Sequence, residues 1–182
     1  MYKLGLSKIF ACHLDSEAYS FFPQYLNMIE WWLSHGRTST TQKNNNFTAF
    51  RNQFYSEWTV DWKGYNSQHA QTSCLFALKA LNSNIQSKQE LKHSFAIISP
   101  VSVKIENKKF IFVTKHTKKA YVELIPKTLT QNILLEQAQN QHWKIGQVLL
   151  TPKWCAIPFS KDIDLTQEKD PTLQEYLKYS LV

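Results

Sequence analysis

The sequence has few of the residues and motifs on which common enzyme sites depend. Its 182 residues include only four glycines and three cysteines. It contains no Gly-rich phosphate loop, no Cys-x-x-Cys pair, no His-Glu-x-x-His motif and no Gly-x-Ser-x-Gly turn. Because these signatures are absent, we expect no catalytic residue, no metal site and no cofactor in this chain.

The cysteines and the apolar segments also exclude several classes of protein. Cys12, Cys74 and Cys155 are far apart, odd in number and each set among apolar residues, which argues against a disulfide framework or a zinc ribbon. No apolar run approaches the roughly 20 residues that cross a bilayer, and the first residues are too polar for a signal peptide. We therefore expect a cytoplasmic protein with no membrane partner.

The residues that are abundant point to a folded, basic protein. Hydrophobic residues make up 43% of the chain and aromatic residues 14%, enough to bury a core. Lysine and arginine number 21 against 14 acidic residues, and the stretch 95–161 alone carries ten lysines against three acids. This excess favours an anionic partner such as nucleic acid. Only Arg37 and Arg51 are arginines, which argues against base-specific readout.

Three helices are predicted in the first half of the chain. In the first, Pro23 fits the opening turn, Gly36 fits the C-terminal stop, and the apolar residues recur at helical spacing: Phe22, Leu26, Ile29 and Leu33. The second helix follows a polar loop over 37–46 and presents one face of large residues: Phe47, Phe50, Phe54 and Trp58. The third helix spans 65–81 and can be capped by Asn66 or Ser67.

The third helix has an apolar face built mostly of small residues. These are Ala70, Cys74, Ala77, Leu78 and Leu81. Small side chains permit close approach of neighbouring helices, so we interpret Cys74 as a core thiol. His69 and Cys74 point about 140° apart on a helix and should not form a nucleophile and base pair.

After residue 94 the apolar period changes from 3.6 to about 2, which predicts strands. The expected strands are 95–99, 101–105, 109–114, 121–125, 146–152 and 153–159. The sequences ENKK and KHTKK predict hairpin turns, 129–139 predicts a short helix, and 172–182 a terminal helix. The predicted fold class is α+β: a helical subdomain of about three helices (1–94) beside a small OB-like antiparallel β-barrel of about six strands (95–161), then an acidic tail (162–182).

A lysine-rich surface in the predicted barrel is the leading candidate site. The lysines lie in or beside the two turns, with Phe110, Phe112 and Tyr121 between them, and are Lys104, Lys108, Lys109, Lys115, Lys118 and Lys119. Lysines reach phosphates and aromatic rings stack on bases, as in small barrels that bind single strands or structured RNA. The alternative is that the lysines form a solubilising rim on edge strands and that the aromatic residues belong to the core.

Two further groups of polar residues are candidates. At the start of the third helix, the polar side chains that could meet a phosphate backbone, or serve ordinary capping, are Gln68, His69, Gln71 and Thr72. Asp162 and Asp164 alternate on a predicted strand and could share one face in a metal-dependent nuclease site. A solvated acidic tail is the competing interpretation, since no suitable third acid follows on a structured element.

Two segments resemble the N-terminal half of TnpB-type proteins, the OrfB family of small insertion sequences. FYSEW followed by YNSQHAQTSCLFALKAL resembles the family's Ser-x-x-Ala-x-Thr helix. SVKIENKKFIFVTKHTKKAYVELIP is similar to the strand pairs of its wedge barrel, and WKIGQVLLTPKWCAIPFSKDI to the hairpin that precedes its nuclease domain. The resemblance covers about residues 50–163 and implies a recognition lobe and an OB-like wedge that hold a guide RNA and assist target reading.

The sequence departs from this family where the nuclease would begin. Relatives continue into a RuvC-like domain with three metal-binding acids and usually a zinc ribbon, whereas DIDL is followed here by TQEKD. One carboxylate cannot hold two metals, so we expect no DNA cleavage. The resulting hypothesis is a truncated, TnpB-like protein of a transposable element that binds structured RNA or DNA, with a separately encoded nuclease half as a candidate partner.

An alternative hypothesis is a protein-interaction or inhibitor module. It would dock a partner through the aromatic residues of the first helix, Tyr25, Trp31 and Trp32.

Overall fold

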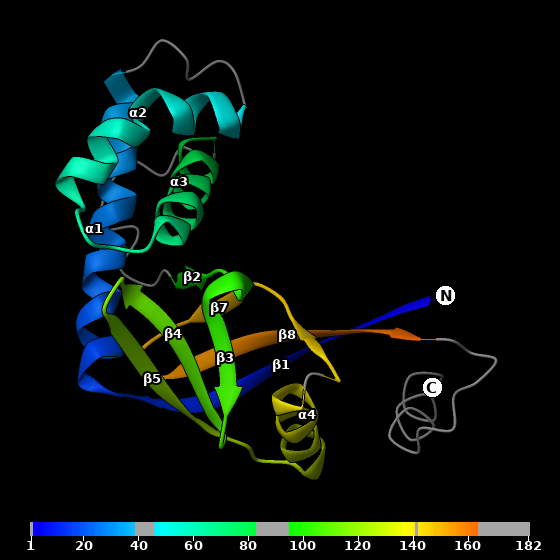
Figure 1. Cartoon of the computed structure of the whole chain (residues 1–182). Coiled ribbons are helices and arrows are strands. Elements are labelled where there is room, and N and C mark those ends of the chain that lie inside the picture. Colours follow the sequence, from blue (N-terminus) through cyan, green and yellow to red (C-terminus); the bar gives the residue numbers. More distant parts are fainter. Residues whose placement is uncertain (1, 39–45, 83–94, 141, 164–182) are drawn as a thin grey trace.

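The computed structural model describes residues 2–38, 46–82, 95–140 and 142–163, which form helices and one antiparallel sheet (Figure 1). The helices are α1 (Ser16–Thr38), α2 (Phe47–Asp61), α3 (Ser67–Asn82) and α4 (Leu129–Gln139). The strands are β1 (Tyr2–Leu14), β2 (Ala96–Ile98), β3 (Val103–Glu106), β4 (Lys109–Lys115), β5 (Lys118–Ile125), β6 (Lys144–Ile145), β7 (Val148–Leu150) and β8 (Trp154–Ile163). The predicted α+β class is confirmed, and the predicted helix at 172–182 lies outside the described residues.

Helix α1 is longer than its apolar spacing predicts. It begins directly after Asp15, whose Oδ1 accepts a hydrogen bond from the N–H of Ala18 at 2.7 Å. Pro23 therefore lies inside the helix and not in its first turn, and Gly36 is buried before the helix ends. A Cβ added at Gly36 would lie 2.6 Å from Cδ1 of Leu81, so this glycine allows α1 and α3 to touch rather than stopping the helix.

Helix α3 packs its small residues against the other helices, as predicted. Ala70, Cys74 and Ala77 have no exposed surface. The helix starts after Asn66, whose Oδ1 accepts a hydrogen bond from the N–H of Gln68 at 2.9 Å. The predicted close approach of helices at this face is confirmed.

The sheet places its strands in the order β2-β7-β8-β1-β5-β4-β3, with β6 paired to β8. Strand β1 was not predicted, although it lies in the middle of the sheet and pairs with β5 and β8. In Figure 1, β1 and β8 run side by side beyond the other strands. Residues 2–14 therefore belong to the sheet and not to the helical subdomain predicted for 1–94.

The sheet is open but strongly curled. Its two edge strands, β2 and β3, are consecutive in the chain and are joined only by Ser99 and the 3₁₀ turn η3 (Pro100–Ser102). The five Cα–Cα steps from Ile98 to Val103, at 3.8 Å each, span at most about 19 Å. If the seven strands lay flat, the two edges of the sheet would be about 29 Å apart. The edges must therefore bend toward each other, but no described pairing joins β2 to β3, so the predicted OB-like barrel is not confirmed.

One hydrophobic core joins the helices to the sheet. The ring of Phe21 on α1 lies 5.3 Å from that of Phe112 on β4 and 4.6 Å from the imidazole of His69 on α3. Phe21 and Phe112 belong to one buried hydrophobic cluster, and His69 is a fully buried polar residue in contact with Phe21. Helix α1 thus fixes the position of α3 relative to the strand that carries the lysine-rich turns.

Candidate nucleic-acid interface

The six lysines predicted as a site form two groups at opposite ends of β4. Lys104, Lys108 and Lys109 lie at the β3–β4 turn, and Lys115, Lys118 and Lys119 at the β4–β5 turn. Six residue steps along β4 separate the two turns by about 20 Å. The predicted turns at ENKK and KHTKK are confirmed, but the lysines do not gather in one patch.

Carboxylates balance much of the charge of the β3–β4 group. Nζ of Lys104 lies 3.1 Å from Oε2 of Glu106. Lys109 faces Glu106 across β3 and Glu123 across β5 in the strand register. Lys108 is exposed at a backbone φ of 59°. This end of β4 therefore offers a phosphate little net positive charge.

The β4–β5 group stands on a turn that is fixed to the helical unit. The N–H of Asn66 donates to the carbonyl of Thr114 at 3.2 Å, and the N–H of His116 donates to the carbonyl of Gly64 at 2.9 Å. Nζ of Lys115 lies 4.6 Å above the ring of Tyr65. Figure 1 shows the turn beside α1. We call Lys115, Lys118 and Lys119 the β4–β5 turn site.

Two hollows flank this turn and share Lys118. The Lys119 hollow has a volume of about 270 Å³ and is lined by Val113, His116, Thr117, Lys118, Lys119 and Tyr121. The Glu17 hollow has a volume of about 220 Å³ and is lined by Glu17, Ser20, Phe21, Gln24, Tyr65, Lys115 and Lys118. Sequence reasoning missed Glu17 and Tyr65, because each comes from a different element and carries no local signal.

The aromatic residues between the lysines differ in their access to a ligand. Phe110 and Phe112 have no exposed surface and belong to the core, so the prediction that they stack on bases is wrong. Tyr121 is 41% exposed and follows Lys119 on the outer face of β5. Of the three, Tyr121 alone can meet a base.

Two of the four polar residues predicted at the start of α3 are buried and cannot meet a phosphate. His69 is fully buried, and its Nε2 donates a hydrogen bond to the carbonyl of Val113 at 2.8 Å. Burial lowers the pKa of His69 to about 4, so the imidazole is neutral at pH 7. Thr72 is 4% exposed, which leaves Gln68 and Gln71 as the half-exposed members of the predicted set.

The three cysteines are buried, and one of the two acids predicted as a nuclease site forms an ion pair. Burial raises the pKa of Cys12 to about 11 and that of Cys74 to about 12, so both are thiols at neutral pH, and Cys74 lies in the core as predicted. In the described part of the chain, no three His, Cys, Asp or Glu side chains form a group that could hold a metal. Asp162 pairs with Lys144 at 2.9 Å, and Asp164 lies outside that part.

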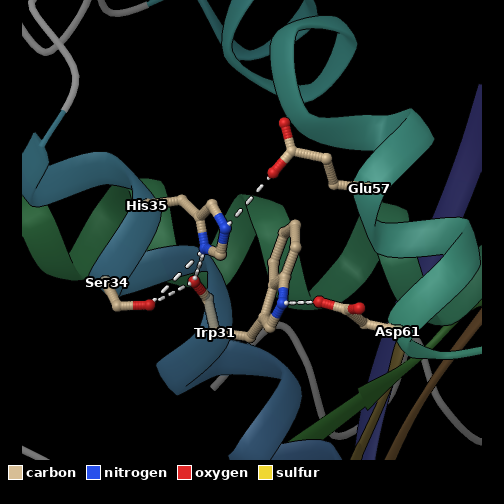
Figure 2. Close-up of polar contacts among 5 residues, drawn as sticks. All are labelled: Trp31, Ser34, His35, Glu57 and Asp61. Atoms are coloured by element: carbon tan, nitrogen blue, oxygen red, sulfur yellow. Dashed lines mark hydrogen bonds and ion pairs between the residues drawn. The ribbon is translucent and has the colours of Figure 1, made fainter.

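The three aromatic residues of α1 that were predicted to dock a partner are not fully exposed. Tyr25 and Trp32 have no exposed surface. Trp31 is half-buried, donates from Nε1 to Oδ2 of Asp61 at 2.8 Å, and stacks on the ring of His35 at 3.8 Å (Figure 2). Trp31 therefore attaches α2 to α1, whereas Trp32 donates from Nε1 to Oγ of Ser73 on α3 at 3.1 Å. The exposed aromatic surface on which the protein-interaction hypothesis depends is not formed by these residues.

Comparison of the sequence with models of known protein families and with curated proteins gives no match. A search of the helices within the described ranges finds none that is both long and apolar enough to cross a bilayer.

Proposed function

We propose that this chain binds nucleic acid at the β4–β5 turn site without cleaving it. The observation that carries the proposal is the projection of three lysines from one fixed turn, beside a hollow whose lining includes no carboxylate. Lysine is the side chain that meets a phosphate as a mobile point charge, and several lysines acting together give a strong, salt-dependent affinity.

The exposed ring of Tyr121 adds a surface for a base. It lines the same hollow as Lys118 and Lys119, so a chain whose phosphate meets the lysines can stack a base on the tyrosine. The site contains no arginine fork that would read a base edge. This composition favours binding that follows the backbone and shape of the ligand rather than its sequence.

The arrangement of the helices and the sheet supports a more specific proposal, a likeness to the N-terminal half of TnpB-type proteins. A helical unit beside a curled antiparallel sheet is what the resemblance to TnpB-type proteins implies for a recognition lobe and a wedge. We therefore propose a nuclease-less, TnpB-like half of a transposon-encoded protein, with an OB-like wedge. Its ligands are structured RNA or DNA, and its candidate protein partner is a separately encoded nuclease half.

The test is a binding titration on the purified chain with a structured RNA and with duplex DNA at about 50 mM salt. Replacing Lys118 and Lys119 with Gln should weaken binding more than tenfold and lower the slope of log affinity against log salt by about two. The matched control replaces Lys108 and Lys109 with Gln, which removes the same charge at the other end of β4 and should have a smaller effect. Absence of binding by the unaltered chain would sink the proposal.

A further inference from the structure

The two hollows beside Lys118 differ in charge. Two lysines, Lys118 and Lys119, line the Lys119 hollow together with His116, and no carboxylate does. The Glu17 hollow also has two lysines, Lys115 and Lys118, but its lining includes the carboxylate of Glu17. A phosphate that enters either hollow meets lysines, but only in the second does it also meet an anion.

The carboxylate of Glu17 is held from two sides. Oε1 accepts a hydrogen bond from Oγ1 of Thr114 at 2.7 Å, and Oε2 lies 3.6 Å from Nζ of Lys118. The Glu17 side chain is 26% exposed, against 58% for Lys118. Because one oxygen is bonded to a buried threonine of β4, the carboxylate cannot turn away from an incoming phosphate without losing that hydrogen bond.

This fixed charge acts on the site in two ways. It neutralises part of the charge of Lys118 in the free protein, and it repels an anion that approaches Lys115. Lys115 is further occupied by its contact with the ring of Tyr65. Lys119 makes no ion pair among the described residues, so its charge is the one most available to a phosphate.

We propose that Glu17 makes the β4–β5 turn site one-sided. A phosphodiester binds in the Lys119 hollow, while Glu17 excludes phosphate from the Glu17 hollow and holds the affinity below that of three unopposed lysines. This inference rests on the proposed function, because it assigns the ligand's position within the same site.

The first measurement compares Glu17→Gln with the unaltered chain. Glutamine keeps an acceptor for Thr114 but removes the charge, so the turn should stay in place. We expect nucleic-acid binding at about 50 mM salt to tighten by about 3- to 10-fold, and the salt slope to steepen by about one. The matched control is Glu136→Gln on α4, which changes net charge equally away from the turn and should alter binding little.

The second measurement is a double-mutant cycle between Glu17 and each flanking lysine. In the chain that keeps Glu17, Lys119→Gln should weaken nucleic-acid binding several-fold, whereas Lys115→Gln should weaken it only slightly. In the Glu17→Gln background, Lys115→Gln should become nearly as costly as Lys119→Gln. Thermal unfolding of each variant shows whether the fold is intact.

The outcomes separate this inference from the proposal on which it rests. If Lys118 and Lys119 are needed for binding but Glu17→Gln leaves the affinity unchanged, the role proposed for Glu17 is wrong. The proposed binding function then stands. Weaker binding by a folded Glu17→Gln variant would also overturn the role proposed for Glu17, because removal of a repelling charge should not weaken the binding of an anion. If the unaltered chain does not bind, both proposals fail.

Discussion

The side chain of His69 lies where α3, α1 and β4 meet. Its Nε2 donates to the carbonyl of Val113, its ring contacts Phe21, and its Nδ1 has no partner among the described residues. Adding a proton to this ring would place an unpaired charge in the core, which explains the lowered pKa. A histidine at a helix start, where a phosphate site is plausible from sequence, here joins the helices to the sheet.

His69 should make the stability of the fold depend on pH. Its pKa is about 4 in the folded protein against 6.5 for an unperturbed histidine. Between these values the unfolded chain binds a proton that the folded chain does not, so the free energy of unfolding should decrease as pH falls from 6.5 to 4. The loss from this residue should reach about 3 kcal/mol. Urea unfolding at several pH values measures it.

The control for that prediction is His69→Gln. Glutamine can still donate to the carbonyl of Val113 but does not titrate in this range. Its unfolding free energy should change less between pH 6.5 and 4 than that of the unaltered chain. Identical pH dependence in the two proteins would show that His69 is not the residue responsible.

Among the helices, α2 is attached to α1 through side-chain contacts along its length, including ring contacts of Phe50 with Trp32 and of Phe54 with His35. Figure 2 shows Trp31 bonded to Asp61, and His35 between the carbonyl of Trp31 and the carboxylate of Glu57. Nδ1 of His35 lies 2.7 Å from the carbonyl oxygen, and Nε2 lies 3.6 Å from Oε2 of Glu57. These contacts, together with the buried Phe50 and Trp58, hold α2 on the helical unit.

Removing the Asp61 carboxylate should loosen α2 without unfolding the sheet. We expect Asp61→Ala to lower stability by about 0.5–1 kcal/mol, because the indole N–H of Trp31 loses an acceptor but remains partly accessible to water. Amide hydrogen exchange should accelerate in α2 and stay unchanged in β4 and β5. Asp61→Asn keeps an acceptor and should behave like the unaltered chain. Equal acceleration in both units would contradict a local role.

The helices could be predicted because their signals are local, whereas β1 and the site depended on distant pairing. Phe47, Phe50 and Trp58 repeat within one helix, so their spacing alone indicates α2. The alternating apolar residues of β1 are interrupted by Lys8, and its partners lie more than 100 residues away. The six lysines stand out in the sequence, but their division between the two ends of β4 follows from strand pairing, and Glu17 comes from another element.

At the scale of the whole molecule, β1 holds the sheet together. It pairs ten of its residues with β8 and four with β5, so it joins the β2-β7-β8 side of the sheet to the β5-β4-β3 side. It also leads directly into α1 through Asp15. The helical unit and the sheet therefore share one chain segment as well as one core.

A chain that lacks residues 1–14 should fail to form the sheet. Both β5 and β8 would lose their central partner, and we expect the loss of the cooperative thermal transition and of near-UV circular dichroism. Adding a peptide of residues 1–14 should restore part of the signal, whereas a peptide of the same composition in scrambled order should not. A cooperative transition in the shortened chain would show that the sheet forms without β1.

The position of β1 also determines the order of events during synthesis. Phe10 pairs with Cys155, and at about 5–20 residues per second the ribosome needs roughly 7 to 29 seconds to pass from one to the other. During that interval one edge of a thirteen-residue strand has no native partner, although β5 emerges earlier and pairs with its other edge. An unpaired strand of this length is prone to pairing with other chains. A nascent-chain chaperone that shields the first fourteen residues should therefore raise the yield of folded protein.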